Sequence, residues 1–140
     1  MAVAHRTSKP AHPLFAILLA GSVPLFLGVL FSDMAYSSSY EIQWKNFASW
    51  LLVGALVSSG FALLWMVIDL VRGQRRGRQW SLALLLLLLA WVTGFVNALI
   101  HAKDAWASMP DATILSVVAA ALALAATWVA LAVRTWGDGR

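Results

Sequence analysis

Four long apolar runs, separated by short polar segments, dominate the pattern of hydrophobic and polar positions along the chain. They cover about residues 13–32, 47–71, 80–100 and 112–133. Each run has the roughly 20 residues that an α-helix needs to cross the hydrocarbon core of a bilayer. None shows the alternation of apolar and polar residues that is typical of strands in membrane barrels. The pattern therefore predicts an all-α, integral membrane bundle of four transmembrane helices.

The connections and the small residues within the runs indicate how these helices pack. Short connections favour antiparallel neighbours, so we expect an up-down topology. Small residues recur every four positions, as at Gly54, Ser58 and Ala62. Such stripes allow helix backbones to approach closely within a membrane. They suit either packing inside the bundle or a homo-oligomer, and the sequence does not separate these two uses.

Basic residues are distributed unevenly between the two sides of the expected membrane. Of the 10 Lys and Arg residues, only Lys45 and Lys103 lie outside the tails and the segment between the second and third runs. Because cytoplasmic segments are rich in Lys and Arg, both termini are predicted to be cytoplasmic. The expected organisation is a flexible cytoplasmic tail over 1–12, a single membrane domain over 13–136 and a cytoplasmic tail over 137–140.

The composition supports a membrane protein and excludes several other classes. The chain of 140 residues is 61% hydrophobic and 11% charged, with a mean hydropathy of +0.80. Average soluble proteins contain about 25% charged residues, so an ordinary soluble enzyme is excluded. The net charge of +4 follows the predicted topology and is not assigned to nucleic-acid binding. We predict a multi-pass protein of the bacterial inner (cytoplasmic) membrane, in contact with the lipid bilayer.

Polar residues near the outer ends of the apolar runs form a candidate ligand site. Polar groups at membrane depth are costly and tend to face the bundle interior. We therefore predict that they converge in a cluster that faces the periplasm. This cluster either binds a ligand, a metal or a proton through His101, or consists only of hydrogen bonds that bridge helices. Its predicted members are Asp33, Tyr36, Asn46, Asn97, His101 and Asp104.

No catalytic residue, metal site or bound cofactor is predicted. The chain has no cysteine, which excludes disulfides and cysteine-ligated clusters. A haem with two histidine ligands needs both at one depth. However, His5 and His12 precede the first run on the cytoplasmic side, while His101 follows the third run on the outer side. Haem held by a Met ligand or across a dimer, and a metal near His101, stay open as alternatives. Motifs of phosphate-binding loops, zinc proteases and serine hydrolases are absent, so we do not expect an enzyme.

A basic segment connects the second and third runs. Its arginines hold this segment in the cytoplasm under the positive-inside rule. They also suit contact with anionic lipid, since each basic residue near a membrane surface contributes about 1 kcal/mol of attraction. The predicted lipid contacts are Arg72, Arg75, Arg76 and Arg78.

Several short segments, in a fixed order along the chain, carry a family resemblance. They are His12-Pro13, Ser32-Asp33-Met34-Ala35-Tyr36, Trp44-x-Asn46-Phe47-x-x-Trp50-Leu51-Leu52, Ile68-Asp69 and Asn97-Ala98-Leu99-Ile100-His101-Ala102-Lys103-Asp104-Ala105-Trp106. The set spans nearly all of the chain from His12 to Trp136. It resembles the bacterial membrane family catalogued as domain of unknown function 2231.

The resemblance implies a small four-helix protein of the inner membrane and implies no activity. Many relatives carry additional histidines near the start of the first helix and in the second loop. This chain has Phe15 and other apolar residues at the first place and no histidine at the second. The departure argues against transferring a haem or metal function from such relatives.

The predicted function is a non-catalytic binding or accessory module of unassigned activity. It would engage a ligand, or another membrane or periplasmic protein. One alternative is a redox or electron-transfer membrane subunit associated with a periplasmic dehydrogenase. Another is an oligomeric small transporter, although the two halves of the chain show no inverted repeat.

Overall fold

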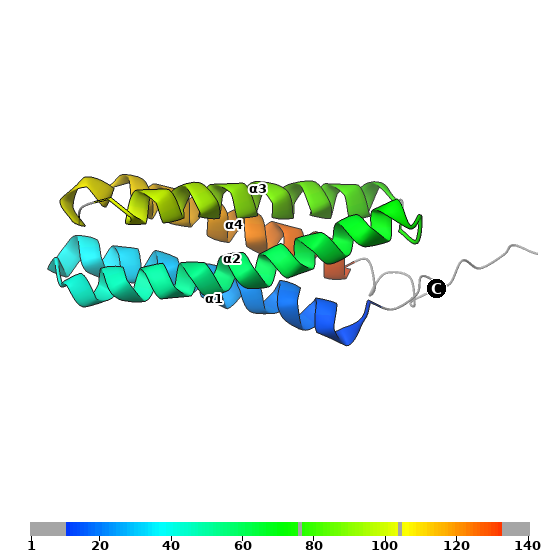
Figure 1. Cartoon of the computed structure of the whole chain (residues 1–140), viewed down its shortest axis with the longest axis horizontal. Coiled ribbons are helices and arrows are strands. Elements are labelled where there is room, and N and C mark those ends of the chain that lie inside the picture. Colours follow the sequence, from blue (N-terminus) through cyan, green and yellow to red (C-terminus); the bar gives the residue numbers. More distant parts are fainter. Residues whose placement is uncertain (1–10, 76, 104, 133–140) are drawn as a thin grey trace, which may run out of the picture.

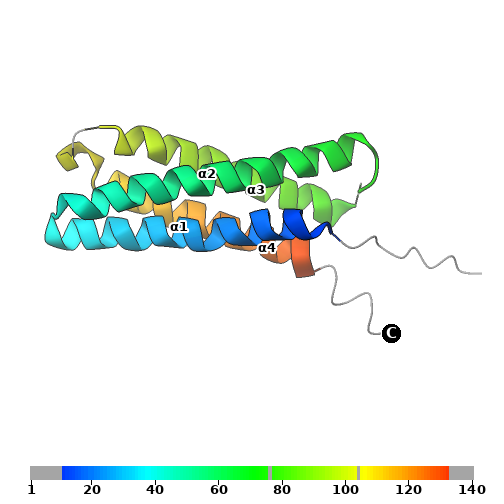
Figure 2. The ribbon, with the colours of Figure 1, turned by 60° about the horizontal axis from the view of Figure 1, so that its bottom comes forward.

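The computed structural model describes residues 11–75, 77–103 and 105–132, which form four long helices. Figures 1 and 2 show these helices running side by side along one axis. Each is long and apolar enough to cross a membrane, which confirms the predicted all-α bundle of four membrane helices. The elements are α1 (Pro13–Ser39), α2 (Ile42–Val71), α3 (Arg78–His101), the short 3-10 helix η1 (Ala105–Ser108) and α4 (Asp111–Ala132).

The helices form an up-down bundle in which chain neighbours pack together. The most extensive contacts are those of α1 with α2 and of α3 with α4, and further contacts join α1 to α4 and α2 to α3. The start of α1, the end of α4 and the α2–α3 connection lie at one end of the bundle, which we call the arginine end (Figure 1). The α1–α2 and α3–α4 connections lie at the opposite end, which we call the cluster end.

At the cluster end, α1 and α2 continue beyond the apolar runs of the sequence. Helix α1 ends at Ser39 rather than near residue 32, and α2 begins at Ile42 rather than near residue 47. The hydroxyls of Ser37, Ser38 and Ser39 donate to carbonyls one turn earlier in α1. These polar residues therefore satisfy their hydroxyls within the helix. An apolar run marks the hydrocarbon thickness, whereas the helix extends past it into the interface.

The start of α1 includes a residue that the sequence placed in the flexible tail. His12 caps the helix, because its Nδ1 accepts a hydrogen bond from the Leu14 N–H at 3.2 Å. Pro13 follows at the first helical position, where its missing N–H costs nothing. The imidazole of His12 also lies 5.1 Å from the Trp65 ring, measured between centroids. The predicted tail residues 1–10 and 137–140 lie outside the described residues.

Small residues line the faces along which the helices meet. Lipid offers no hydrophobic contrast, so close approach of backbones is a main source of helix association in membranes. Gly94 on α3 illustrates how close the helices come, since a Cβ there would lie 2.9 Å from Phe26 Cε1. At this position a small residue is thus used for packing inside the bundle. On α4, which has the longest such face, the buried residues are Ala112, Ser116, Ala119, Ala120, Ala123, Ala126 and Ala130.

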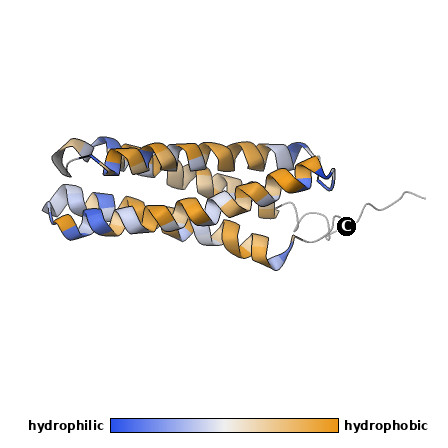
Figure 3. Cartoon of the chain, viewed as in Figure 1, coloured by the Kyte–Doolittle hydropathy of each residue, from blue (hydrophilic) through white to orange (hydrophobic). Residues whose placement is uncertain are grey.

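Large apolar side chains cover the outside of the bundle. Trp50 and Trp128 are 78% and 73% exposed, and Ile17 and Phe31 are also exposed. Figure 3 shows apolar residues over the middle of the helices and hydrophilic residues concentrated toward the two ends. This distribution is the one expected for a bundle surrounded by lipid.

Candidate functional site

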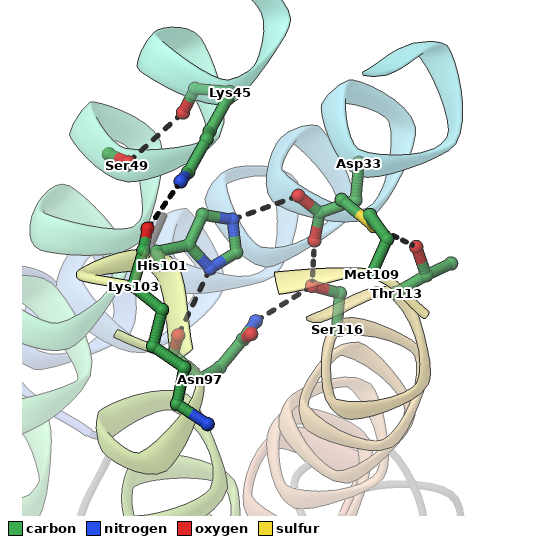
Figure 4. Close-up of polar contacts among 9 residues, drawn as sticks. All are labelled: Asp33, Lys45, Ser49, Asn97, His101, Lys103, Met109, Thr113 and Ser116. Atoms are coloured by element: carbon green, nitrogen blue, oxygen red, sulfur yellow. Dashed lines mark hydrogen bonds and ion pairs between the residues drawn. The ribbon is translucent and has the colours of Figure 1, made fainter. Parts of the chain in front are cut away.

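Four polar side chains from three helices meet inside the bundle near the cluster end (Figure 4). They are Asp33 on α1, Asn97 and His101 on α3, and Ser116 on α4, and we call them the polar cluster. Asp33 and Asn97 have no exposed surface, and the other two are also buried. With a helical rise of about 1.5 Å per residue, Asp33 lies about 9 Å inside the end of α1. The carboxylate is thus withdrawn from the end of α1, whereas His101 is the last residue of α3.

Hydrogen bonds connect the polar cluster into a closed ring. The Asn97 Nδ2 donates to Ser116 Oγ at 2.8 Å, and Ser116 Oγ donates to Asp33 Oδ2. The other carboxylate oxygen, Asp33 Oδ1, lies 2.9 Å from His101 Nε2. His101 Nδ1 then lies 3.0 Å from the backbone oxygen of Asn97, where the ring began. Three helices are thereby joined through one carboxylate.

The geometry of this ring fixes where protons must be. The backbone oxygen of Asn97 can only accept, so His101 Nδ1 carries a hydrogen. The contact between His101 Nε2 and Asp33 Oδ1 then requires a second proton between those two atoms, because two lone pairs facing at 2.9 Å would repel. The pair is therefore either an imidazolium with a carboxylate or a neutral imidazole with a carboxylic acid. Both forms have no net charge.

Helix α2 adds a buried cation near the same end. Lys45 is buried, and its Nζ donates to the backbone oxygen of Lys103 at 2.7 Å. This bond ties α2 to the segment that follows α3 (Figure 4). All four helices therefore contribute polar contacts at the cluster end.

The structure brings together three of the six residues proposed from the sequence. Asp33, Asn97 and His101 are in contact within the polar cluster. Tyr36 is buried one turn further along α1, where its ring packs edge-on against Tyr40 at 6.3 Å. Asn46 is exposed on α2 and does not join the cluster, because it follows the buried Lys45 and so points to another side of the helix. Asp104 lies outside the described residues.

Ser116 in the polar cluster and Lys45 near it are not among the six site residues predicted from the sequence. In the sequence, Lys45 stands out only as one of the two basic residues outside the tails and the basic segment. A signal for Ser116 was nevertheless present. Asn97 precedes the end of α3 by four residues and Ser116 follows the start of α4 by five, so antiparallel packing places them at similar depth.

The described residues offer little to a metal or haem. Within residues 11–75, 77–103 and 105–132, no three His, Cys, Asp or Glu side chains come together in a way that could hold a metal ion. His12 caps α1 at the arginine end, whereas His101 lies at the cluster end. These two histidines therefore cannot ligate one iron within a single chain.

At the arginine end, part of the basic segment folds back onto the bundle. The guanidinium of Arg75 lies 4.8 Å from the Trp80 ring centroid, and its Nε is 3.8 Å from Asp69 Oδ2. By contrast, Arg72 and Arg78 are exposed. Arg76, the fourth predicted lipid contact, lies outside the described residues.

Comparison with known proteins places the chain in a family. The family described as predicted membrane protein, DUF2231, matches residues 10–137. The chain belongs to DUF2231. No curated protein and no solved structure matches it. The resemblance drawn from the sequence is thus confirmed, and the whole polar cluster lies within the matched range. Since the DUF2231 description names a membrane protein and no activity, function has to be argued from the cluster itself.

Proposed function

We propose that this protein is a non-catalytic binding or accessory protein of the bacterial inner membrane, with its polar cluster toward the periplasm. The observation that carries the proposal is the complete burial of Asp33 between partners from α3 and α4. Polar groups inside a membrane bundle are expensive, and they are commonly retained for function. The exposed apolar surface suits contact with lipid, with another membrane protein or with a second copy of the chain.

The order of the hydrogen bonds supports binding rather than hydrolysis. In a Ser-His-Asp triad, histidine lies between serine and aspartate and removes the serine proton. Here the aspartate lies in the middle, because Asp33 contacts both Ser116 Oγ and His101 Nε2. A serine hydroxyl that donates to a carboxylate in this way is not activated by the imidazole. We therefore propose that the cluster binds a ligand or joins the helices by hydrogen bonds, and that it performs no acyl transfer.

The distribution of basic residues supports a cytoplasmic arginine end. Arg72, Arg75 and Arg78 lie there, and cytoplasmic segments are enriched in such residues. Because the chain lacks cysteine, single cysteines introduced at exposed Ser38 and Gln74 test this orientation. In intact cells, a membrane-impermeant maleimide is expected to label Ser38→Cys and to label Gln74→Cys only after the inner membrane is permeabilised. The reverse pattern would place the cluster in the cytoplasm.

The absence of a cofactor is part of the proposal and is tested on purified protein. After extraction in mild detergent, we expect no Soret absorbance, no bound metal and a native mass made up of protein and lipid. A Soret band or a metal at one equivalent per chain would favour the redox subunit instead. The native mass also gives the oligomeric state directly.

The same measurement tests contact of the arginine end with anionic lipid. Exposed Arg72 and Arg78 are free to reach phosphate groups, whereas Arg75 already contacts Asp69 and Trp80. We expect an Arg72→Gln/Arg78→Gln variant to retain less anionic phospholipid than the wild type in the native mass spectrum. An unchanged lipid content would limit these arginines to a topological role.

A further inference from the structure

Ser116 differs from most other serines in the described helices. A serine in a helix usually donates to the carbonyl three or four residues earlier. In this chain that pattern holds for Ser22, Ser37, Ser38, Ser39, Ser49 and Ser59. Ser116 instead donates to the carboxylate of Asp33 on another helix, while it accepts a hydrogen bond from Asn97. The intrahelical bond that other serines make is therefore not the one Ser116 makes in this structure.

This alternative completes a second hydrogen-bond arrangement of the polar cluster. A serine hydroxyl offers one donor and two acceptor lone pairs. If Asp33 Oδ2 carried a proton, it would donate to Ser116 Oγ, which would still accept from Asn97. The Ser116 side chain would then have to turn its hydroxyl toward the carbonyl of Ala112, four residues earlier in α4, as helical serines commonly do. The contact between Asp33 Oδ2 and Ser116 Oγ is kept in this arrangement, with the hydrogen donated in the opposite direction.

We propose that the polar cluster is a reversible proton-binding site, with Asp33 Oδ2 as the accepting atom and Ser116 as the switch. The proposal rests on the proposed function, in which the cluster binds a ligand, and it identifies that ligand as a proton. The uptake step starts from the form with an imidazolium and a carboxylate: an O–H bond forms at Oδ2, and the hydronium that delivered the proton leaves as water. The charge of the cluster rises by one. No covalent bond of Ser116 breaks, since its hydroxyl only rotates.

An unpartnered acceptor beside the ring provides independent support. Asn97 Oδ1 is fully buried and makes no hydrogen bond in the described structure. Leaving a buried acceptor unpaired is costly, so a hydrogen-bond donor bound at this position would explain why the group is retained. A water or hydronium bound at Asn97 Oδ1 would supply that donor next to Ser116, which is where the proton is needed.

Other titratable groups near the cluster end affect proton uptake. Lys45 is buried and positively charged, and it opposes a further positive charge at the cluster. Tyr36 is buried close to Asp33 along α1. The remaining titratable side chains described at this end are exposed and therefore better screened by water, namely Tyr40, Glu41, Lys103 and Asp111.

Infrared difference spectroscopy of the whole chain in detergent tests the proposal. On acidification we expect the C=O stretch of a buried carboxylic acid to appear in the wild type and to be lost in Asp33→Asn. Asp111→Asn makes the same chemical change at an exposed position on α4, and we expect it to keep the band. Absence of an Asp33-dependent carboxyl band over the pH range in which the protein stays folded would overturn the proposal.

A second variant tests the role of Ser116 and does not depend on the folding of Asp33→Asn. Ser116→Ala removes the acceptor of the protonated carboxyl while leaving the contact of Asp33 with His101 in place. We expect the carboxyl band to persist and to shift to higher frequency, as a less hydrogen-bonded acid does. An unshifted band would refute Ser116 as the switch. The spectra are independent of orientation in the cell, so a failed labelling test and a failed proton test are distinguishable.

Discussion

Replacement of Asp33 by leucine is expected to lower the free energy of unfolding by about 3 kcal/mol, the cost typical of removing one partner of a buried pair. The substitution leaves His101 Nε2 without its contact at 2.9 Å and Ser116 Oγ without an acceptor. Neither group can reach water, because both residues are buried. The measurement is unfolding in mixed micelles of mild detergent and SDS, followed by the helical circular dichroism signal.

A double variant distinguishes loss of the pair from a general packing defect. The double variant Asp33→Leu/His101→Leu removes both partners and is expected to be more stable than Asp33→Leu alone. As a control, Glu41→Leu removes an exposed carboxylate that makes no capping hydrogen bond at the same end of the bundle. We expect it to change stability by less than about 0.5 kcal/mol. An Asp33→Leu protein as stable as the wild type would show that the ring contributes nothing.

Gly94→Leu is expected to destabilise the bundle by about 3 kcal/mol through overpacking, and to do so without touching a polar group. Even a Cβ at this position would lie 2.9 Å from Phe26 Cε1 and 3.2 Å from Leu56 Cδ2. Phe26 is 1% exposed, and protein interiors are close-packed, so its ring has little room to move aside. The helices must therefore separate to admit a leucine side chain, and the same unfolding assay measures this loss.

Gly21 provides the matched control for this substitution. A Cβ at Gly21 meets nothing within 4 Å, although the residue is also in the interior of a helix. Gly21→Leu is expected to stabilise the protein slightly, since leucine is favoured over glycine in helices by up to about 1 kcal/mol. Equal effects at the two glycines would mean that close contact at Gly94 does not limit packing.

The fold was largely predictable because a bilayer restricts the choices of the chain. Runs of about 20 apolar residues can only be satisfied as helices in lipid, and short connections make them antiparallel. The helix ends were less predictable. Ser37 and Ser39 lower the hydropathy after residue 32, yet they bond to their own helix and prolong α1. Hydropathy therefore locates the membrane better than it locates the ends of helices.

The site was only partly predictable, for a related reason. Asp33, Asn97 and His101 stand out in the sequence because such side chains are rare among apolar residues. Ser116 does not stand out, since serine is common in membrane helices and usually bonds within its own helix. Only the arrangement of three helices reveals that its hydroxyl faces Asp33. Asn46 shows the opposite error, because it lies at the same end of the bundle but is exposed and does not join the cluster.

Asp33 and its partners belong to different halves of the chain, and this bears on the order of assembly. The hairpin of α1 and α2 brings the carboxylate, whereas the hairpin of α3 and α4 brings both His101 and Ser116. During synthesis the first hairpin would thus hold an acidic group without its partners until the second hairpin arrives. Completion of the ring then coincides with completion of the bundle. A first hairpin without the second would expose the Asp33 carboxyl to lipid with no hydrogen-bond partner. Such an exposed acid is a feature by which cellular quality control would recognise an unfinished protein.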